Sequence, residues 1–417
     1  MIKLAIPFIE ALLTCTCFYL LKEKKMAGLS KGIWAVFFGL FAVAFYLFIS
    51  KVLFRSTHPE VWDFSAFYLY GKVAADGHNF YQPGYFEEAF NSLHLPFTDL
   101  NGFEDEVLKV GFPYPPPTIL YFIPLGMLSY NSALFVWTFF NLLVVLGCIY
   151  LAYEQFFKED RLNGLLLVAT LFFFSIPVKS TVLYSQTNFI LLLYLLLMKK
   201  YEGKGVAGIF LALAFFTKPY MIILGLFFLF TKNWKAVAYC ALTALLLCGI
   251  TFLIFGKEPF LSFIYHNPSQ RLPSSIFSEE INQSLHGVLL RMGLITLDKP
   301  VSYLLIAAAI LAAAGAFIVF LLKRKMVSSI LATLLLVGLL LYPGTLNYYA
   351  VLLLFILYQL LSTEWGTDTR VGSTIFIVCL VFAIISYYLF TGLCLLLAAV
   401  VLYALLPARA IPAAVKR

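Results

Sequence analysis

The sequence predicts an all-α polytopic membrane protein, and three observations support this fold class. Of its 417 residues, 62% are hydrophobic and 12% are charged, whereas a soluble domain carries about 25% charged residues. The mean hydropathy is +0.93. Apolar runs approach or exceed the roughly 18 residues that cross a hydrocarbon core. None of them alternates as a barrel strand does, so we expect helices; examples are 33–49, 236–255, 301–322 and 327–341.

Clusters of basic residues orient these predicted helices. Lysine and arginine gather between the apolar runs, at 22–31, 199–204, 232–235 and 323–325. Cytoplasmic loops of membrane proteins carry such an excess of positive charge. The net charge of +8 therefore follows from topology. We expect a multi-pass protein of the plasma (inner) membrane whose partner is the lipid bilayer and not nucleic acid.

The first elements follow in chain order. Residues 4–21 are predicted to be a retained helix and not a signal peptide, because a basic loop and a second helix follow without a small-residue cleavage site. Residues 33–53 lead outward to a long extracytoplasmic loop at 54–112. Aromatic and polar residues mix there, for example at 85–93, and this pattern predicts short amphipathic helices in the interface.

Three apolar segments, 114–130, 134–153 and 164–180, come next, where the basic clusters require an even number of crossings. The first contains three consecutive prolines near its start and Pro124 further on. One of the three must be re-entrant or cross only halfway, and 114–130 is the first candidate, although the sequence leaves the choice among the three open. Such backbone is tolerated at membrane depth where it lines a cavity.

The rest of the chain is predicted to alternate between the two faces, with a second extracytoplasmic loop at 256–299. The total is about 11–13 transmembrane helices in a single domain over residues 1–417. The predicted crossings after the ambiguous stretch are 187–198, 205–217, 220–231, 236–255, 301–322, 327–342, 347–362, 372–388 and 390–406.

Cysteine and histidine usage argues against a metal site. All seven cysteines lie in apolar segments and are interpreted as small core residues. The five histidines fall in segments assigned to the outer face, but no pair has helical i, i+4 spacing and no acidic triad accompanies them. We expect no metal and no other cofactor.

Asp63 is the outer-face residue best suited to chemistry. It lies in the aromatic run 61–68, just past the outer end of the second predicted helix. One hypothesis is a helix N-cap, because aspartate is a favoured capping residue. The other is a general base, because a carboxylate among aromatic residues at the membrane boundary is partly desolvated and its pKa moves toward neutrality. The two roles are compatible.

Three basic residues are candidates for binding an anionic ligand at the same face. Lys218 precedes Pro219 at a break between two apolar segments, where inserting a lysine costs roughly 2.5–3.5 kcal/mol; a snorkelling side chain is the alternative. Arg291 re-enters the membrane near this face, and its planar guanidinium suits phosphate oxygens. Arg271 is a weaker candidate, because a solvated loop charge explains it equally well.

Polar and aromatic side chains of the outer segments are candidates for binding a sugar or an acceptor. Gln186 and Asn188 belong to a Ser-Gln-Thr-Asn run that opens a helix. That run presents amides to a sugar, or it only caps the helix. The full set of candidates is Tyr81, Tyr114, Gln186, Asn188, Asn282, Gln283 and His286.

The order of these motifs resembles glycosyltransferase family 87 over nearly the whole chain. Residues 185–188 are similar to the family's Gly-Gln-x-Asn, with serine in the glycine position. Two departures stand out: residues 344–349 lie where some members carry a Ser-Trp-x-His-like motif, and 4–21 looks like an addition ahead of the usual first helix. The other matching motifs are Asp63 with its aromatic run, Gly77-His78-Asn79-Phe80-Tyr81, Phe112-Pro113-Tyr114-Pro115-Pro116, Pro124-Leu125, Lys218-Pro219, Asn282-Gln283-Ser284 and Arg291.

The resemblance implies a GT-C type membrane enzyme that moves a sugar, mannose in the family's bacterial α-mannosyltransferases, from a polyprenyl-phosphate donor. The acceptor would be a hydroxyl of a glycolipid or glycan on the extracytoplasmic face, and the transfer would invert the anomeric centre. Asp63 would be the base, with Lys218 and Arg291 on the phosphate. The alternative is a transporter or flippase of a lipid-linked or anionic solute. The sequence leaves the sugar, the acceptor, the linkage and the oligomeric state open.

Overall fold

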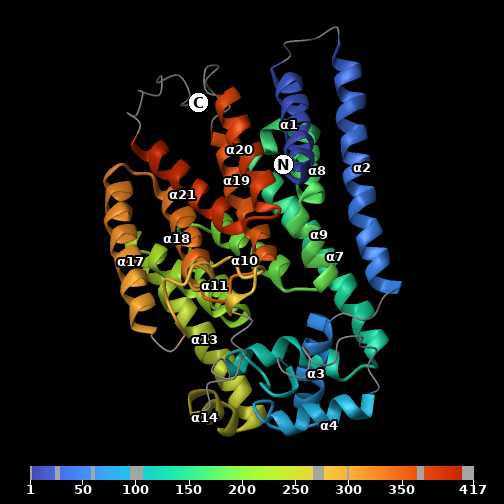
Figure 1. Cartoon of the computed structure of the whole chain (residues 1–417), viewed down its shortest axis with the longest axis vertical. Coiled ribbons are helices and arrows are strands. Elements are labelled where there is room, and N and C mark those ends of the chain that lie inside the picture. Colours follow the sequence, from blue (N-terminus) through green and yellow to red (C-terminus); the bar gives the residue numbers. More distant parts are fainter. Residues whose placement is uncertain are drawn as a thin grey trace.

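The computed structural model of the chain describes residues 2–23, 29–57, 62–93, 107–265, 277–297, 300–363 and 371–405. Every named element within these ranges is a helix (Figure 1). A single isolated bridge among them pairs Asn282 with Leu346 in antiparallel fashion. The predicted all-α class is therefore confirmed.

Five helices of the described ranges are long and apolar enough to cross a membrane, which confirms a polytopic membrane protein. Two shorter helices, α8 (Arg161–Phe174) and α9 (Ile176–Tyr184), form an apolar pair bent by 60°, which is either a broken span or a re-entrant loop. The predicted total of 11–13 crossings requires still shorter apolar helices to cross as well and stays a prediction. The five long helices are α1 (Ile2–Lys22), α2 (Ser30–Thr57), α7 (Tyr130–Phe156), α13 (Trp234–Phe255) and α17 (Pro300–Lys323).

The shorter helices complete the bundle and add small elements at its ends. Those that follow α9 are α10 (Asn188–Lys200), α11 (Ala207–Thr217), η5 (Pro219–Leu224), α12 (Gly225–Phe230), α14 (Glu258–Tyr265), α16 (Leu285–Arg291), α18 (Val327–Leu341), η7 (Asn347–Leu352), α19 (Leu353–Thr363), α20 (Val371–Ile385) and α21 (Leu389–Leu405). Those that precede α9 are α3 (Trp62–Ala75), α4 (Pro83–Leu93), η3 (Pro116–Tyr121), α6 (Ile123–Gly126) and η4 (Lys158–Asp160).

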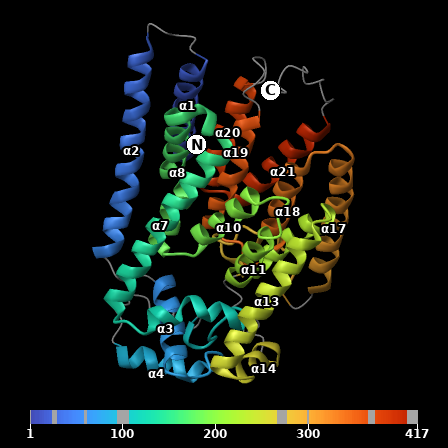
Figure 2. The same ribbon diagram turned by 180° about the vertical axis from the view of Figure 1, so that it is seen from behind.

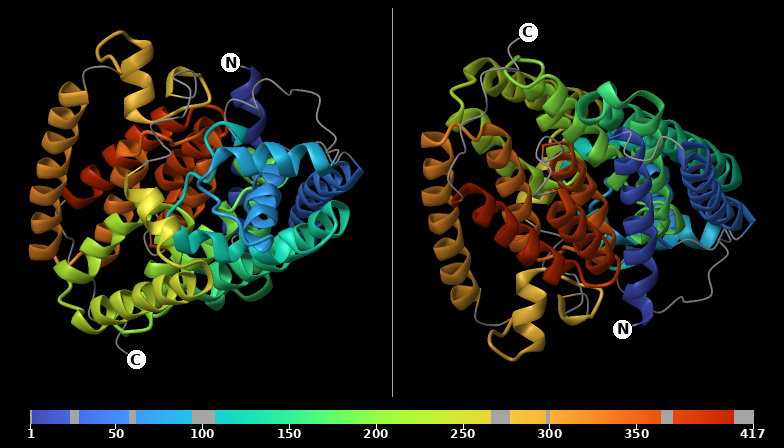
Figure 3. Two further views of the ribbon diagram at one scale, coloured as in Figure 1. Left: turned by 90° about the horizontal axis from the view of Figure 1, so that it is seen from below. Right: turned by 90° about the horizontal axis from the view of Figure 1, so that it is seen from above.

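The molecule has a bundle and a smaller layer at its lower end. Figures 1 and 2 show α3, α4 and α14 gathered there, below the ends of α2 and α13. The short helices predicted for the loop 54–112 are thus present as α3 and the amphipathic α4. Seen from below and above, α2 and α17 lie at opposite edges of the bundle (Figure 3).

The segment 114–130 behaves as its prolines predict. It forms η3 and α6, of six and four residues, which are too short to span a bilayer. These short helices agree with the choice of 114–130 as the first candidate for the segment that does not cross fully. The long helix α7 and the bent pair α8 and α9 follow. Whether that pair crosses as one span decides the predicted even number of crossings, which stays a prediction.

Two glycines allow α6 to pack directly against α3. A Cβ atom added to Gly71 would lie 2.0 Å from the carbonyl oxygen of Phe122, and one added to Gly126 would lie 2.1 Å from the carbonyl carbon of Gly71. Any larger residue would push the two backbones apart. This contact sets the position of α3, the helix that carries Asp63.

At the end of the bundle opposite to α3, ion pairs join chain segments that are far apart in sequence. Lys22 lies 3.0 Å from Asp160, and Lys200 lies 2.7 Å from Glu154. The chain ends of α1, α7 and α10 therefore share one face. The side of the membrane on which this face lies is inferred from its basic residues.

Candidate active site

Asp63 is the second residue of α3, one position inside the helix. Residues 58–61, just before this helix, lie outside the described ranges, so the N-cap role stays a hypothesis; a carboxylate in the first turn favours the helix dipole in either case. The side chain is partly buried, and this burial raises the pKa of Asp63 to about 6. A hydrogen bond with Gln186 and the positive charges of Lys218 and Arg55 act in the opposite direction. Asp63 thus lies in the electrostatic environment of the end of α2, the turn after α9 and the residue that follows α11.

Lys218 joins α11 to η5 in an extended conformation, with φ −147° and ψ 113°. The following proline disfavours a helical conformation here and breaks the helix. The residue is 4% exposed. Its Nζ atom lies 5.2 Å from the ring centroid of Tyr114 and 5.1 Å from that of Tyr349, so two aromatic faces stabilise the ammonium. Lys218 is a buried cation in an aromatic site, and the snorkelling alternative does not describe it.

Tyr114 is held in place from two sides. The buried Tyr81 donates a hydrogen bond from its hydroxyl to the Tyr114 carbonyl oxygen at 2.5 Å. Thr118, in the proline-rich segment that follows, donates a hydrogen bond to the Phe216 carbonyl at the end of α11. These contacts bring the proline run next to Lys218. Tyr81 acts through Tyr114, and the structure gives it no contact with Asp63.

The turn between α9 and α10 presents amide groups to the site. Gln186 and Asn188 are buried, and both donate to Tyr348: Gln186 Nε2 to its hydroxyl at 3.3 Å and Asn188 Nδ2 to its carbonyl at 3.5 Å. The acceptor atoms Gln186 Oε1 and Asn188 Oδ1 are buried without a hydrogen-bond partner among the described residues. Buried acceptors of this kind call for a ligand or an ordered water.

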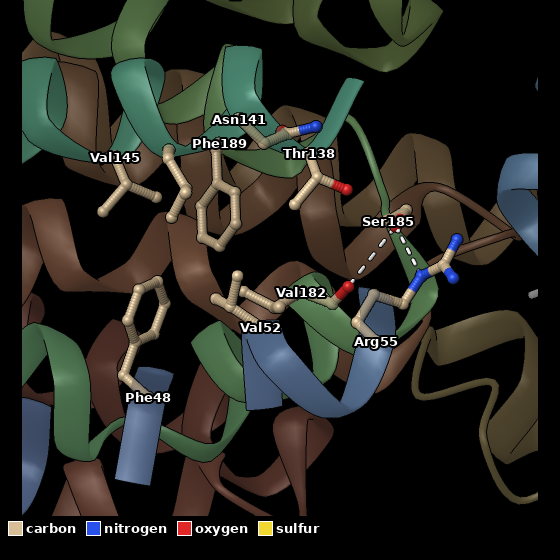
Figure 4. A pocket seen from close by; sticks show the side chains of 10 residues that line it. Phe48, Val52, Arg55, Thr138, Asn141, Val145, Val182, Ser185 and Phe189 are labelled. Carbon is tan, nitrogen blue, oxygen red and sulfur yellow. Dashed lines mark hydrogen bonds between the residues drawn. The ribbon is translucent and has the colours of Figure 1, made fainter. Parts of the chain in front are cut away.

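Ser185 precedes this turn in a left-handed conformation, with φ 52° and ψ 38°. Such a conformation costs a residue other than glycine roughly 1–2 kcal/mol. Glycine would adopt this conformation without that cost. In this chain the serine hydroxyl accepts a hydrogen bond of 3.0 Å from Nε of Arg55 (Figure 4).

Arg55 is a residue that the sequence analysis missed. It lies near the end of α2, is 1% exposed, and places its guanidinium 5.8 Å from the ring centroid of Phe64. A signal was present in the sequence: a lone arginine at the outer end of an apolar helix runs against the positive-inside rule. The structure brings this arginine, and not Arg291, into the electrostatic environment of Asp63.

A narrow crevice lies beside Arg55, between α2, α7, α9 and α10 (Figure 4). Apolar side chains line most of it, with Phe48 at one end, while Ser185 and Arg55 lie at the other end. The crevice faces the apolar region of the protein and lies apart from the tyrosines around Lys218.

A cluster of tyrosines forms one wall of the site. The ring centroids of Tyr220 and Tyr342 lie 4.8 Å apart, and those of Tyr348 and Tyr349 lie 5.3 Å apart. Tyr220 also stacks on Tyr349, with 5.9 Å between their centroids. These residues come from η5 and from the segment that follows α18. Aromatic faces of this kind pack well against sugar rings.

Asn282 is fully buried and connects two outer segments. Its Nδ2 atom donates to the Pro343 carbonyl at 2.7 Å, and its Oδ1 atom accepts from the Ser284 hydroxyl at 2.7 Å. The Gln283 amide donates to the Thr345 carbonyl at 2.8 Å. Because both side-chain ends of Asn282 form hydrogen bonds within the protein, these contacts fix the loop that leads to Tyr348.

Three further candidates lie away from Lys218. Arg291 is exposed and donates from Nη1 to the Glu279 carbonyl at 2.6 Å. His286 is half-buried, packs edge-to-face on Tyr303 at 4.6 Å, and has its pKa lowered by burial. Gln283 accepts a long hydrogen bond of 3.5 Å from the Phe390 amide. The described residues show no contact between any of these side chains and Asp63 or Lys218.

The remaining predictions on ligands are limited by the described ranges. Arg271 lies outside the described residues, as do His58, His94 and His266. Within the described ranges there is no group of three His, Cys, Asp or Glu side chains arranged to hold a metal ion. The expectation of a metal-free reaction stays a prediction.

Comparison with known proteins assigns the family. A sequence model of glycosyltransferase family 87 matches residues 112–346, which is more than half of the chain. The chain belongs to glycosyltransferase family 87. The match includes Tyr114, the 185–188 turn and Lys218, whereas Asp63 and Arg55 precede it. The protein is therefore a membrane glycosyltransferase.

A curated protein is similar to the chain over a shorter stretch. It is the polyprenol-phosphate-mannose-dependent α-(1-2)-phosphatidylinositol pentamannoside mannosyltransferase of Mycolicibacterium smegmatis (strain ATCC 700084 / mc(2)155). The two proteins are 26% identical over 147 residues, which cover 35% of this chain and 36% of the relative. The match thus spans about a third of the relative's length. No solved structure matches the chain.

Proposed function

We propose that this family 87 glycosyltransferase moves a sugar from a polyprenyl-phosphate donor to a hydroxyl of a glycolipid or glycan acceptor, with inversion. The observation that carries the proposal is the combination of a partly buried carboxylate, Asp63, and a buried ammonium, Lys218, that act on each other in a tyrosine-lined site. Inverting sugar transfer needs a base for the acceptor and positive charge for the leaving phosphate.

Asp63 accepts the proton of the acceptor hydroxyl as its oxygen attacks the anomeric carbon. The new carbon–oxygen bond forms while the bond from that carbon to the phosphate oxygen breaks. The phosphate leaves with the electron pair, and Lys218 offsets the negative charge that collects on it. A pKa of about 6 leaves Asp63 ionised at neutral pH and makes it a stronger base than an ordinary aspartate.

The unsatisfied acceptor atoms of Gln186 and Asn188 support a sugar site in the same place. Sugar hydroxyls donate to such amide oxygens and would complete their hydrogen bonds. The tyrosine faces around Lys218 would pack on the ring. We therefore assign Gln186, Asn188 and Tyr114 to sugar or acceptor binding.

The positive charge at the phosphate is assigned to Lys218. Arg291 was expected to share this role, but it is exposed and bonded to the Glu279 carbonyl. Its part in donor binding, and that of Arg271, is left out of the proposed mechanism. The family membership also sets aside the transporter alternative as the primary function.

Mannose is the proposed sugar, and a lipid is the proposed acceptor. The name of the M. smegmatis relative supports both, since that enzyme uses polyprenol-phosphate-mannose and acts on a phosphatidylinositol pentamannoside. The extracytoplasmic location of the site is proposed because the basic loops lie at the opposite end of the bundle.

The test is product formation by purified protein. Wild type and Asp63→Asn protein in lipid nanodiscs are incubated with radiolabelled polyprenyl-phosphate-mannose and a membrane lipid extract. We expect a new labelled glycolipid with wild type only. Release of label into water without a glycosylated product, or equal product from both proteins, would contradict the proposal.

A further inference from the structure

Arg55 connects three parts of the active site. Its Nε atom donates to the Ser185 hydroxyl at 3.0 Å, its guanidinium lies over the Phe64 ring, and its charge acts on Asp63 and on Tyr130. These partners belong to α3, α7 and the turn between α9 and α10. A guanidinium with 1% exposure at the end of a membrane helix is costly to retain without a role.

The partner Ser185 is also costly to retain. It occupies a left-handed conformation that glycine adopts freely and other residues adopt at a cost. The hydroxyl gained by having serine here accepts the bond from Arg55. The next residue in the chain is Gln186, which hydrogen-bonds Asp63. The serine thus links the arginine to the turn that orients the base.

We propose that Arg55 is a positioning residue for sugar transfer: anchored on Ser185, its guanidinium fixes the charge and the orientation of Asp63 and Gln186. The inference rests on the proposed function, in which Asp63 is the base. It adds a second cation to the site with a role different from that of Lys218. Lys218 acts on the leaving phosphate, and Arg55 acts on the base.

The role predicts a particular pH dependence. The charged and titratable groups that act on Asp63 are Lys218 and Arg55, which favour its ionised form, and Tyr348 and Tyr349, whose phenols feel its charge in turn. Burial raises the pKa of Asp63, and Lys218 and Arg55 lower it. Without Arg55, only Lys218 remains as a cation that lowers this pKa. The pKa of Asp63 then rises further, and the acidic limb of kcat/KM moves to higher pH.

The experiment measures kcat/KM from pH 4.5 to 8.5 for wild type, Arg55→Gln, Arg55→Lys and the control Lys72→Gln. Lys72 lies on the same helix as Asp63 but is paired with Asp76 near the surface, at 2.8 Å. We expect Arg55→Gln to move the acidic limb up by roughly half a pH unit or more. Arg55→Lys keeps the charge, so its limb stays while kcat/KM falls about tenfold. Lys72→Gln behaves as wild type.

A Ser185→Gly variant tests the anchor without changing charge. Glycine suits the left-handed backbone, so the variant folds at least as well as wild type. We expect the kcat/KM of Ser185→Gly to fall roughly three- to tenfold with no change in the acidic limb. In the double variant Ser185→Gly, Arg55→Gln, we expect kcat/KM to be no lower than in Arg55→Gln alone. Additive losses would mean that Ser185 and Arg55 act independently and would contradict the anchor.

The outcomes separate this inference from the proposed function. An acidic limb unchanged in folded Arg55→Gln protein, while Asp63→Asn abolishes transfer, overturns the role of Arg55 and leaves Asp63 as the base. Full activity of Asp63→Asn would overturn the proposed function, because Asp63 would then not be the base. If Arg55→Gln fails to fold, a shifted acidic limb in Arg55→Lys also overturns the proposal.

Discussion

At the scale of single residues, the sequence located the carboxylate and one cation of the site but missed the other cation. Asp63 and Lys218 were identifiable because each is a charge in an apolar or aromatic setting, where insertion is costly. Arg55 was overlooked because it ends a long apolar helix, where a basic residue is usually a solvated boundary charge. Only the fold shows it buried against Ser185.

Asp63→Asn is expected to separate activity from stability. Without a base, transfer should fall on the order of 10²–10⁴-fold. The folded-state pKa of about 6 lies above the ordinary value of 3.8, so ionised Asp63 destabilises wild type at pH values above 6 and not at pH values below 4. The variant should therefore melt at a higher temperature than wild type at pH 8 and at a similar one at pH 4. A lower melting temperature at pH 8 would contradict the burial of the charge.

Lys218→Gln is expected to impair the donor half of the reaction. Removing the buried ammonium leaves the leaving phosphate without its cation, and kcat/KM for the donor should fall roughly 10²–10³-fold. Arg291→Lys is the matched control, because that side chain is exposed and bonded to Glu279. It should stay within about twofold of wild type. A larger effect of Arg291→Lys than of Lys218→Gln would contradict the assignment to Lys218 alone and would support Arg291 as a phosphate-binding residue.

At the scale of elements, proline content decided which sequence predictions succeeded. The proline-rich segment 114–130, the first candidate for a segment that does not cross fully, forms the short helices η3 and α6. The bend of 60° between α8 and α9 was missed, although Pro177 in the first turn of α9 gave a signal. The contact of α3 with α6 was not predictable, because it depends on Gly71 and Gly126 meeting across the sequence.

Gly126→Ala is expected to disturb α3 and, through it, Asp63. The added methyl group would meet the backbone of Gly71 at 2.1 Å, which no side-chain rotation relieves. We expect a loss of roughly 1–3 kcal/mol of stability together with reduced transfer. Gly84→Ala on α4 is the control, since nothing lies within 4 Å of its added Cβ atom. Thermal unfolding of both variants in one detergent checks the difference, and equal melting temperatures would contradict the close contact.

At the scale of the whole molecule, charge patterning predicted which loops share a face. Lys22, Asp160, Glu154 and Lys200 meet in ion pairs at one end of the bundle, although their loops are far apart in sequence. The way in which short apolar helices pack behind these loops was not predictable, because a helix of fewer than eighteen residues carries no clear spanning signal. The predicted outer loops 54–112 and 256–299 contain the described helices α3, α4 and α14 at the opposite end.

Cysteine labelling of intact cells tests this topology. Glu88→Cys on α4 and Lys323→Cys at the end of α17 are both exposed. In a background with the exposed Cys394 replaced by alanine, a membrane-impermeant maleimide should label position 88 in intact cells and position 323 only after lysis. Labelling of position 323 in intact cells would place the basic loops outside and reverse the proposed location of the site.

The buried amide oxygens of the turn between α9 and α10 allow ligand binding to be measured through the thermal stability of the protein. Gln186 and Asn188 hold buried acceptors that only a ligand or ordered water completes. A compound that hydrogen-bonds to these oxygens binds only the folded state, so it raises the melting temperature once its concentration exceeds its Kd. At a concentration of one hundred times Kd, the free energy of unfolding increases by about 2.7 kcal/mol. Screening lipid-linked sugars by melting temperature would therefore rank the donors without an acceptor and without turnover.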